Sequence, residues 1–283
     1  MKKQLIFGNK TLVMGILNVT PDSFSDGGLY LSVDKAVLHA KKMIKEGADI
    51  IDVGGESTRP GSKSISIDEE IKRVTPVVKK IRKLFPDIFI SIDSYKSEVV
   101  RSSLLEGIDI VNSMGGFTFD LKLPKIIKEF NAPIIIYHIK GKPKDMQKRK
   151  IIYKNLIENI LNFFKEQIEI GKSHGIKKNK FIIDPGIGFG KTVDQNLEII
   201  KKLSYFILLK LPIMIGVSRK SHLGKILQDE LKLSIPPSPT ERLEASLAET
   251  ASAVMNGARI IRTHDVLQTK KFLTVLDRLK NEK

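Results

Sequence analysis

The chain has 283 residues, 41% of them hydrophobic and 28% charged, which is enough apolar material for the core of one large domain. It has no cysteine, which excludes disulfide bonds, a thiol nucleophile and thiolate metal ligands. The formal net charge of +16 comes mostly from lysines spread over predicted helix faces; with only 6% aromatic residues, we interpret it as solvated surface and expect no nucleic-acid partner.

Short apolar runs alternate with amphipathic segments along the whole chain. Each run has the length of a strand that is buried on both faces of a parallel sheet. In chain order the predicted strands are Leu12–Leu17, Ile50–Val53, Ile88–Ile92, Ile108–Val111, Pro133–Ile136, Phe181–Ile183, Pro212–Val217 and Arg259–Ile261. The predicted amphipathic helices include Val33–Glu46, Asp68–Leu84, Ile151–Ser173, Glu241–Asn256 and Val266–Leu279.

This alternation predicts an α/β fold. With no composition break or linker, it indicates one closed (β/α)8 TIM barrel domain over residues 1–283, and a doubly wound open sheet is the structural alternative. We expect residues 4–10 to form a short strand or hairpin that closes the bottom of the barrel. The first residues lack the apolar segment of a signal peptide, and no stretch is long enough to span a bilayer, so we expect a cytoplasmic protein without a membrane partner.

Two segments, Met14–Gly28 and Asp49–Gly61, each join a predicted strand to an unusually polar loop. These loops hold more Gly, Pro, amide, hydroxyl and charged residues than a simple connection requires. Further polar residues lie at the ends of other predicted strands, where the active sites of such barrels are found. The set of strand-end residues is Asn18, Asp93, Asn112, Asp184, Ser218–Ser221 and Arg262–His264. The sequence therefore predicts a ligand site at this one face.

Three of these residues, Asp93, Asn112 and Asp184, follow apolar strands directly. A carboxylate buried at such a place must be hydrogen-bonded or paired with a charge. The three side chains together would form a wall of donors and acceptors for a flat, amide-rich heterocycle such as a pterin or a purine. The alternative is an internal salt-bridge network with Lys220 or Arg262.

The same face collects groups that bind anions. The basic side chains expected there are Arg59, Lys220, Arg262 and His264. For His264, a packed and hydrogen-bonded side chain without a ligand is the alternative. Ser221 is expected at the start of a helix, where a carboxylate is favoured. Asn18 could ligate Mg²⁺ beside a diphosphate, because that ion takes oxygen ligands.

The segment Asp184–Thr192 ends like a phosphate-binding P-loop but does not fit that motif. The motif needs four residues between its glycines, and here only three follow Gly186, with Pro185 at the position that would restore the spacing. We therefore exclude a nucleotide triphosphatase. The glycines are expected to let the backbone pass close to a flat ligand, with Phe189 as an apolar wall.

Through these motifs the chain resembles the dihydropteroate synthase family, the folate-pathway enzymes that sulfonamides target. The resemblance runs from Thr11 to Val266, and the segments that carry it are Met14–Gly28, Asp49–Gly61, Ser91–Lys96, Asp184–Lys191, Gly216–Ser221 and Arg262–Asp265. It implies condensation of 7,8-dihydropterin-6-ylmethyl diphosphate with 4-aminobenzoate to give 7,8-dihydropteroate and diphosphate. It also implies a homodimer formed through the C-terminal helices.

The resemblance implies a role for each matching residue. Asn18 would hold Mg²⁺ against the diphosphate. The pterin would be bound by Asp93, Asn112, Asp184 and Lys220, with Ile139 packed on its face. The departing diphosphate would be bound by Arg262, Thr263 and His264, with Thr58 and Arg59 from the second polar loop. The aminobenzoate pocket would be shaped by Thr58, Pro60, Phe189 and Ser221.

The available groups favour a dissociative, carbocation-like substitution. An electron-rich pterin can stabilise positive charge on its methylene, and the departing diphosphate is stabilised by cations and Mg²⁺. Asp26, on the first polar loop, would stabilise that cation or accept a hydrogen bond from the incoming amine. The aniline nitrogen is neutral at pH 7, so positioning and electrostatics would supply the catalysis.

Two positions depart from the usual pattern of the family. Tyr137 and Ile139 flank His138 where methionines are expected, and Ser113 stands where the family often has Asp. We expect altered affinity rather than lost activity. The functional alternatives are a pterin-binding methyltransferase domain of the same barrel type and a non-catalytic paralogue that binds pterins or anions. A nucleic-acid-binding role is a third alternative.

Overall fold

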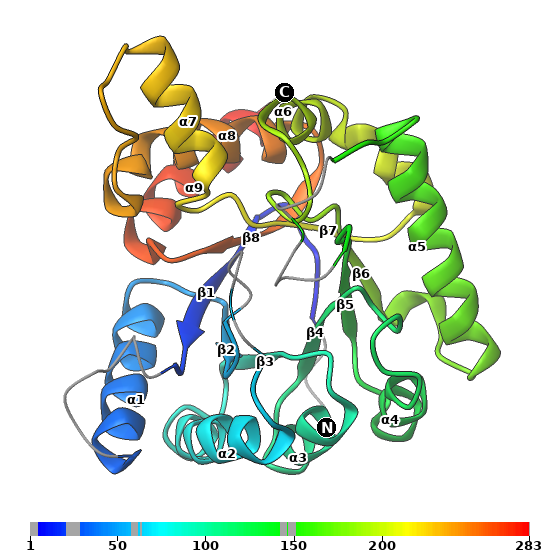
Figure 1. The fold of residues 1–283 in the computed structure, drawn as a ribbon. Coiled ribbons are helices and arrows are strands. Elements are labelled where there is room, and N and C mark those ends of the chain that lie inside the picture. The colour runs from blue at the N-terminus through cyan, green and yellow to red at the C-terminus, as the bar shows by residue number, and fades with distance from the viewer. Residues whose placement is uncertain are drawn as a thin grey trace.

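The computed structural model describes residues 5–20, 29–57, 62, 64–141, 146 and 151–282. Within these ranges eight strands form a closed barrel in which each strand runs parallel to its neighbours in chain order, and the last pairs with the first (Figure 1). The strands are β1 (Leu12–Asn18), β2 (Ile50–Gly54), β3 (Phe89–Asp93), β4 (Ile110–Met114), β5 (Ile134–Tyr137), β6 (Phe181–Asp184), β7 (Ile213–Ile215) and β8 (Ala258–Thr263). The predicted closed barrel is confirmed, and the open sheet is excluded.

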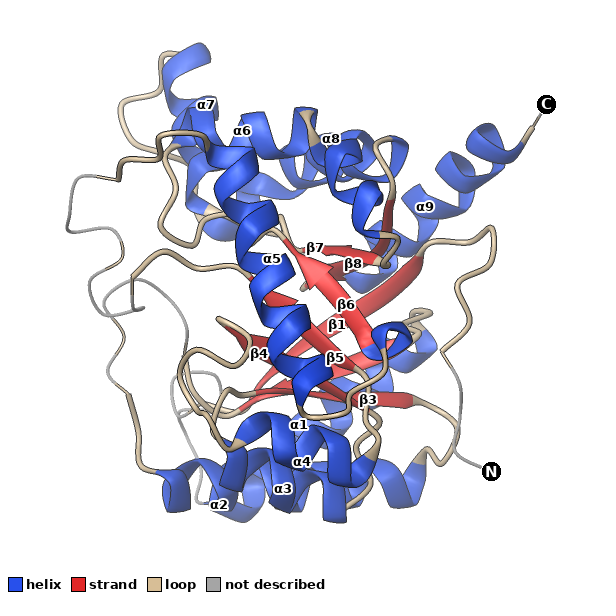
Figure 2. Ribbon diagram, turned by 90° about the vertical axis from the view of Figure 1, so that its right-hand side faces the viewer, coloured by secondary structure: helices blue, strands red, loops and turns tan. Residues whose placement is uncertain are grey.

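Helices surround the barrel on all sides (Figures 1 and 2). In the described ranges they are α1 (Leu29–Lys45), α2 (Ile67–Leu84), α3 (Ser97–Leu105), α4 (Leu123–Phe130), α5 (Leu156–Ser173), α6 (Val193–Lys201), α7 (Ser221–Glu230), α8 (Leu243–Met255) and α9 (Val266–Asn281). The described residues also form 3₁₀ segments before β6, β7 and α8, namely η2 (Lys178–Lys180), η3 (Leu203–Leu209) and η4 (Pro239–Arg242). None of these described helices combines the length and the apolar content that a bilayer crossing requires.

Local sequence explains where these helices begin and end. At the start of α2 the Ser66 hydroxyl accepts a hydrogen bond from the Glu69 N–H, and acidic residues fill the first turn. One stripe of α2, including Val74 and Val78, is fully buried against the barrel. Asn131 ends α4 in the left-handed conformation, at φ 50°.

The N-terminal segment corrects one expectation. Residues 5–11 form neither a strand nor a hairpin. Leu5 and Phe7 nevertheless pack against the apolar cluster inside the barrel, at the end opposite the polar loops. The physical reason is that a closed barrel leaves no free strand edge with which this segment could pair. The segment therefore covers the barrel with these side chains, and its Gly8 and Asn9 carbonyl oxygens accept hydrogen bonds from Arg259 and Asn281.

The interior of the barrel changes from apolar to polar along the strands. Its apolar layer is formed by Met14, Ile50, Ile110, Ile135, Ile182, Met214 and Ile260. Side chains two residues apart on a strand point to the same face. The next inward positions are therefore Asp52, Ser91, Asn112, Tyr137, Asp184 and Arg262, followed by Asn18, Asp93 and His264 at the strand ends. This polar layer places the candidate site at the carboxyl ends of the strands.

Candidate active site

Arg262 on β8 joins two carboxylates across the barrel mouth. Its Nε donates to Asp52 Oδ2 at 2.7 Å, and its Nη2 donates to Asp93 Oδ2 at 2.8 Å. Burial raises the pKa of the Asp93 carboxyl to about 7, although the charge of Arg262 opposes this rise. Burial alone would lower the pKa of Arg262, but Asp52 and Asp93 more than offset it and raise that pKa. The guanidinium therefore remains a cation.

Asp52 is a member of this cluster that the sequence did not single out. Its side chain is fully buried on β2, and Oδ2 also accepts a hydrogen bond from Asn112 Nδ2 at 3.0 Å. Asp52 Oδ1, Asn112 Oδ1 and Ser91 Oγ are buried and make no hydrogen bond with any described residue. Buried polar atoms are rarely left without partners, so three of them in one ring indicate a place where a polar ligand binds.

Asp184 is held by the loop that follows it. Its Oδ1 accepts a hydrogen bond from Gly186 N at 2.7 Å, and burial raises the pKa of this carboxyl to about 6. Gly186 has φ +73°, and a Cβ there would lie 1.8 Å from the carbonyl oxygen of His138. Only glycine fits this approach between the loop and the end of β5.

A buried lysine, Lys191, joins the same loop to His138, the residue after β5. Lys191 Nζ lies 3.0 Å from His138 Nδ1 and donates to the carbonyl oxygens of Gly186 and Phe189 at 2.9 and 3.1 Å. Burial lowers the pKa of His138 well below its usual value, so its neutral Nδ1 can accept from the ammonium. Burial also lowers the pKa of Lys191 to about 7. This loop therefore has a defined position before any ligand arrives.

Lys220 is a cation available to a ligand. Its Nζ makes no hydrogen bond or ion pair with another described residue and lies 4.1 Å from the centroid of the Phe189 ring. Burial and the nearby charge of Arg262 lower the pKa of Lys220 to about 8. Ser221, the next residue, is exposed and begins α7, as expected.

His264 is oriented by Ser218 from the loop after β7. The backbone N–H of His264 donates to Ser218 Oγ at 3.1 Å, and the same Oγ lies 3.1 Å from the ring nitrogen Nδ1 of His264. The hydroxyl can therefore give its own proton to Nδ1, which leaves Nε2 as a donor. Burial, with Arg262 second, lowers the pKa of His264 to about 3, so the ring is neutral at pH 7.

Thr263 does not join the cluster. Its Oγ1 lies 3.1 Å from Thr269 Oγ1 and accepts a hydrogen bond from Asp265 N, so it faces the start of α9. The reason is that β8 continues through Thr263, and its alternation turns this side chain out of the barrel. Ile139 lies half-buried just beyond β5.

Asn18 ends β1 beside Gly54. A methyl group placed on Gly54 would lie 3.6 Å from Asn18 Oδ1 and 3.7 Å from Asp93 Cβ, so Asn18 and Asp93 flank one spot. No group of three or more His, Asp or Glu side chains within the described ranges could enclose a metal ion. A single amide oxygen fits Mg²⁺, which keeps several waters and takes its other ligands from substrate phosphates.

Lys96 holds both sides of the second polar loop. Its Nζ contacts Glu56 Oε2 at 2.6 Å, Glu70 Oε2 at 2.8 Å and the Ile65 carbonyl oxygen at 2.8 Å. These contacts join residues on either side of positions 58–61, which lie outside the described residues. Four predicted site residues lie outside the described residues, namely Asp26, Thr58, Arg59 and Pro60.

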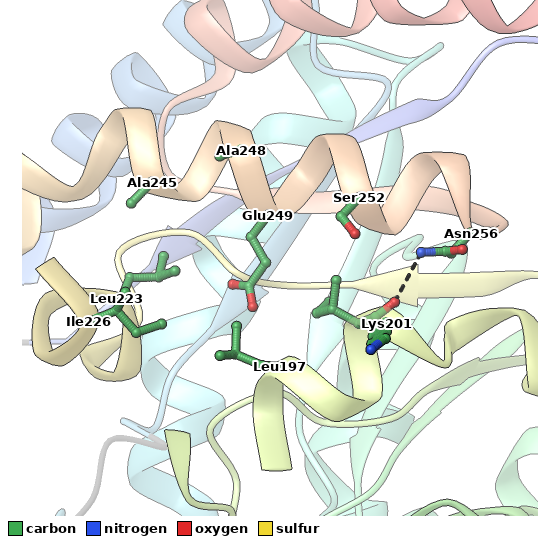
Figure 3. Close-up of a pocket in the computed structure, with 10 residues that line it drawn as sticks. Leu197, Lys201, Leu223, Ile226, Ala245, Ala248, Glu249, Ser252 and Asn256 are labelled. Carbon is green, nitrogen blue, oxygen red and sulfur yellow. Dashed lines mark hydrogen bonds between the residues drawn. The ribbon is translucent and has the colours of Figure 1, made fainter. Parts of the chain in front are cut away.

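A cavity of about 500 Å³ lies away from the barrel mouth, on the outer face formed by α6, α7 and α8 (Figure 3). Leu197 and Ile200 from α6 face Leu223 on α7 and Ala248 on α8 across it. Most of its lining is aliphatic, with Glu249 the acidic group that points into it (Figure 3). This cavity shares no residue with the polar ring.

Comparison with known proteins agrees with this geometry. Residues 14–264 match the family of pterin binding enzymes. The chain is 44% identical to a dihydropteroate synthase of Clostridium beijerinckii, over 97% of this chain and 96% of that one. It superimposes on a dihydropteroate synthase of Clostridium difficile crystallised with pteroic acid, at a TM-score of 0.90 and 41% identity, over 99% of this chain and all of that one. A Xanthomonas albilineans dihydropteroate synthase with 4-aminobenzoic acid matches at a TM-score of 0.88 and 32% identity, over 97% and 94% of the two chains.

Proposed function

This chain belongs to the family of pterin-binding enzymes as a dihydropteroate synthase, a transferase of folate biosynthesis, and from that premise we propose how its residues act. The reaction joins 7,8-dihydropterin-6-ylmethyl diphosphate to 4-aminobenzoate and releases diphosphate. The pterin methylene loses its C–O bond to the diphosphate and gains a C–N bond to the aniline nitrogen, which then loses a proton.

The pterin lies against the polar ring. The observation that carries this assignment is the set of buried oxygens that no described residue hydrogen-bonds, Asp52 Oδ1, Asn112 Oδ1 and Ser91 Oγ. The amino and ring N–H groups of a pterin are donors, which carboxylate and amide oxygens require as partners. Asp184 and Asp93 add further acceptors, and the Lys220 ammonium can donate to the pterin carbonyl.

The diphosphate lies toward the rim, where His264 and Lys220 can donate to it. Arg262 is less free to bind the diphosphate than the resemblance implied, because two of its nitrogens already donate hydrogen bonds to Asp52 and Asp93. It contributes positive charge and its remaining N–H groups. Arg59 and Thr58, from the second polar loop, complete this part of the site in the proposal.

Mg²⁺ is the proposed metal, and Asn18 Oδ1 would be its protein ligand. The ion would neutralise charge on the departing diphosphate. The position of Asn18 supports this, because its amide oxygen flanks the same spot as Asp93 at the carboxyl end of β1.

The reaction needs no activated nucleophile. Buried carboxylates beside the reacting carbon favour positive charge on the pterin, and the neutral aniline attacks without a general base. The aminobenzoate ring would pack on Phe189, with Thr58 and Pro60 beside it and its carboxylate at Ser221, where the start of α7 favours an anion. Asp26 would stabilise the cation or bind the amine.

A homodimer is the proposed assembly, in which a second copy covers the aliphatic cavity between α6, α7 and α8. Exposed apolar side chains support it, since Leu197 in the cavity lining is 43% exposed and Met255, the residue before the lining residue Asn256, is 60% exposed. We also propose a cytoplasmic location, because a diphosphate ester does not cross a bilayer unaided and must be met where it is made.

The test is turnover with the pterin diphosphate, 4-aminobenzoate and Mg²⁺, followed by diphosphate release. We expect release to require both substrates and to fall at least about 100-fold in Asp184→Ala or Arg262→Ala, since each removes a charged hydrogen-bond partner. Tight pterin binding without release would instead identify a non-catalytic paralogue. Absence of both pterin binding and release would contradict the proposal.

A further inference from the structure

Tyr137, the last residue of β5, adds a phenol to the polar ring. It follows Ile135 by two residues and so points into the barrel, where it is 4% exposed. Its hydroxyl donates to Asp93 Oδ1 at 3.1 Å, while Asp93 Oδ2 receives Arg262 Nη2 at 2.8 Å. Both oxygens of the Asp93 carboxylate are therefore held by protein donors, one from β5 and one from β8.

The ring of Tyr137 makes a second contact. Its centroid lies 5.2 Å from that of Phe189, at an interplanar angle of 47°. Phe189 in turn carries the Lys220 ammonium 4.1 Å from its own ring centroid. Tyr137 thus touches both the carboxylate on one side of the mouth and the aromatic wall on the other.

We propose that Tyr137 is a positioning residue for the pterin, whose O–H fixes the orientation of the Asp93 carboxylate and whose ring sets the place of Phe189. The inference rests on the proposed function, because it assumes that Asp93 binds the pterin. A methionine at this position would fill similar space but has no proton to donate, so the hydrogen bond to Asp93 depends on the tyrosine.

The charges around Asp93 determine what the phenol contributes. Arg262 attracts the Asp93 carboxylate, whereas Asp52 and Glu70 repel it, and the charge of Asp93 in turn raises the pKa of Lys220 against the effect of burial. Burial raises the pKa of Tyr137 well above its usual value, so its proton stays on the phenol. The hydrogen bond from Tyr137 favours ionised Asp93, and its loss would raise the pKa of that carboxyl.

The experiment compares Tyr137→Phe with the unsubstituted enzyme. We expect KM for the pterin diphosphate to rise about five- to tenfold and KM for 4-aminobenzoate to stay within about twofold, because only the pterin contacts Asp93. The acid limb of pterin affinity should move to higher pH, measured with 6-hydroxymethylpterin by fluorescence. Tyr137→Met should behave like Tyr137→Phe toward the pterin.

The matched control is Tyr205→Phe, which removes a hydroxyl from a side chain that is 54% exposed on η3 and should change nothing. Tyr137→Phe kinetics and pH dependence equal to those of the unsubstituted enzyme would overturn the inference alone. Equal rises in both KM values with an unshifted acid limb would also overturn it, since they would indicate a structural role only. Failure of the unsubstituted enzyme to bind the pterin would contradict the proposed function itself, and this inference with it.

Discussion

Asp52 and Arg262, from strands β2 and β8, are joined by a hydrogen bond of 2.7 Å between Oδ2 and Nε. Asp52 is completely buried, so water does not reach the carboxylate of this ion pair. Removing one partner of such a pair is far more costly than the net strength of the pair, because the other charge remains buried. Both the stability and the proposed pterin site therefore depend on Asp52.

We expect Asp52→Asn to lower kcat/KM for the pterin diphosphate about 100-fold, because Arg262 loses one of its two charged partners and Asn112 would donate to a neutral amide instead of a carboxylate. Steady-state kinetics and urea unfolding measure the two effects. Asp109→Asn is the control. Asp109 Oδ2 lies 2.5 Å from Arg82 Nη2, and this ion pair is not part of the barrel mouth. Asp109→Asn should lower stability but keep kcat/KM within about twofold. Equal catalytic losses in the two variants would contradict the expectation.

The raised pKa of Asp184 makes stability depend on pH. An unfolded Asp titrates near 4, whereas burial raises the pKa of Asp184 in the fold to about 6. Between these values the folded chain binds the extra proton, so the free energy of unfolding falls as pH rises through this window, by up to about 1.4 kcal/mol per pH unit. Asp184→Asn should flatten that slope in chemical denaturation from pH 4 to 7. An unchanged slope would show that burial of this carboxyl has no such effect.

Gly186→Ala should disrupt the loop after β6. The added methyl would meet the His138 carbonyl at 1.8 Å in a left-handed backbone conformation, so we expect a loss of at least about 2 kcal/mol in unfolding free energy together with weaker pterin binding. Gly8→Ala is the matched control, because nothing lies within 4 Å of the site of its methyl. Thermal unfolding compares the two variants, and a Gly186→Ala protein as stable as Gly8→Ala would be evidence against the loop geometry.

Asn18→Ala tests the metal proposal. We expect the Mg²⁺ concentration for half-maximal diphosphate release to rise about tenfold, because the ion loses its protein ligand. Affinity for 6-hydroxymethylpterin, which lacks the diphosphate, should not change. Removal of Mg²⁺ with a chelator should stop release in the unsubstituted enzyme. An unaltered Mg²⁺ requirement in Asn18→Ala would exclude this residue as the ligand.

The proposed homodimer predicts that sedimentation gives twice the 31.8 kDa mass of the chain. Leu197→Glu places a charge on the wall of the cavity between α6, α7 and α8 and should yield monomers. Leu121→Glu, at a residue that is 81% exposed before α4, should leave the dimer intact. A monomeric parent, or a Leu197→Glu variant that still dimerises, would rule out this interface.

The barrel and much of its polar ring were predictable from the sequence. Parallel strands that are buried on both faces leave apolar runs whose order can be read directly. Asp93, Asp184 and Arg262 lie within one residue of their strand ends, and strand ends of a barrel meet at one face. The structure does bring them together.

Which further residues join the ring depends on the face of the strand on which each one lies. Asp52 and Tyr137 join the ring because of the face on which they lie, and that face follows from counting two residues onward from Ile50 and Ile135 once the apolar inner layer is known. The side chain of Thr263 lies outside the ring, and the strand end alone does not reveal which way a side chain turns. The uncharged state of His264 depends on burial beside Arg262, which no local pattern reveals.

Asp52 Oδ1 and Asn112 Oδ1, which no described residue hydrogen-bonds, have a consequence for the selection of inhibitor-resistant variants. An inhibitor that supplies donors to these oxygens would use the interactions proposed for the natural pterin. A substitution that weakens such an inhibitor would remove a partner that the substrate needs in the proposed binding mode. Resistance arising at this ring would therefore carry a loss of folate synthesis.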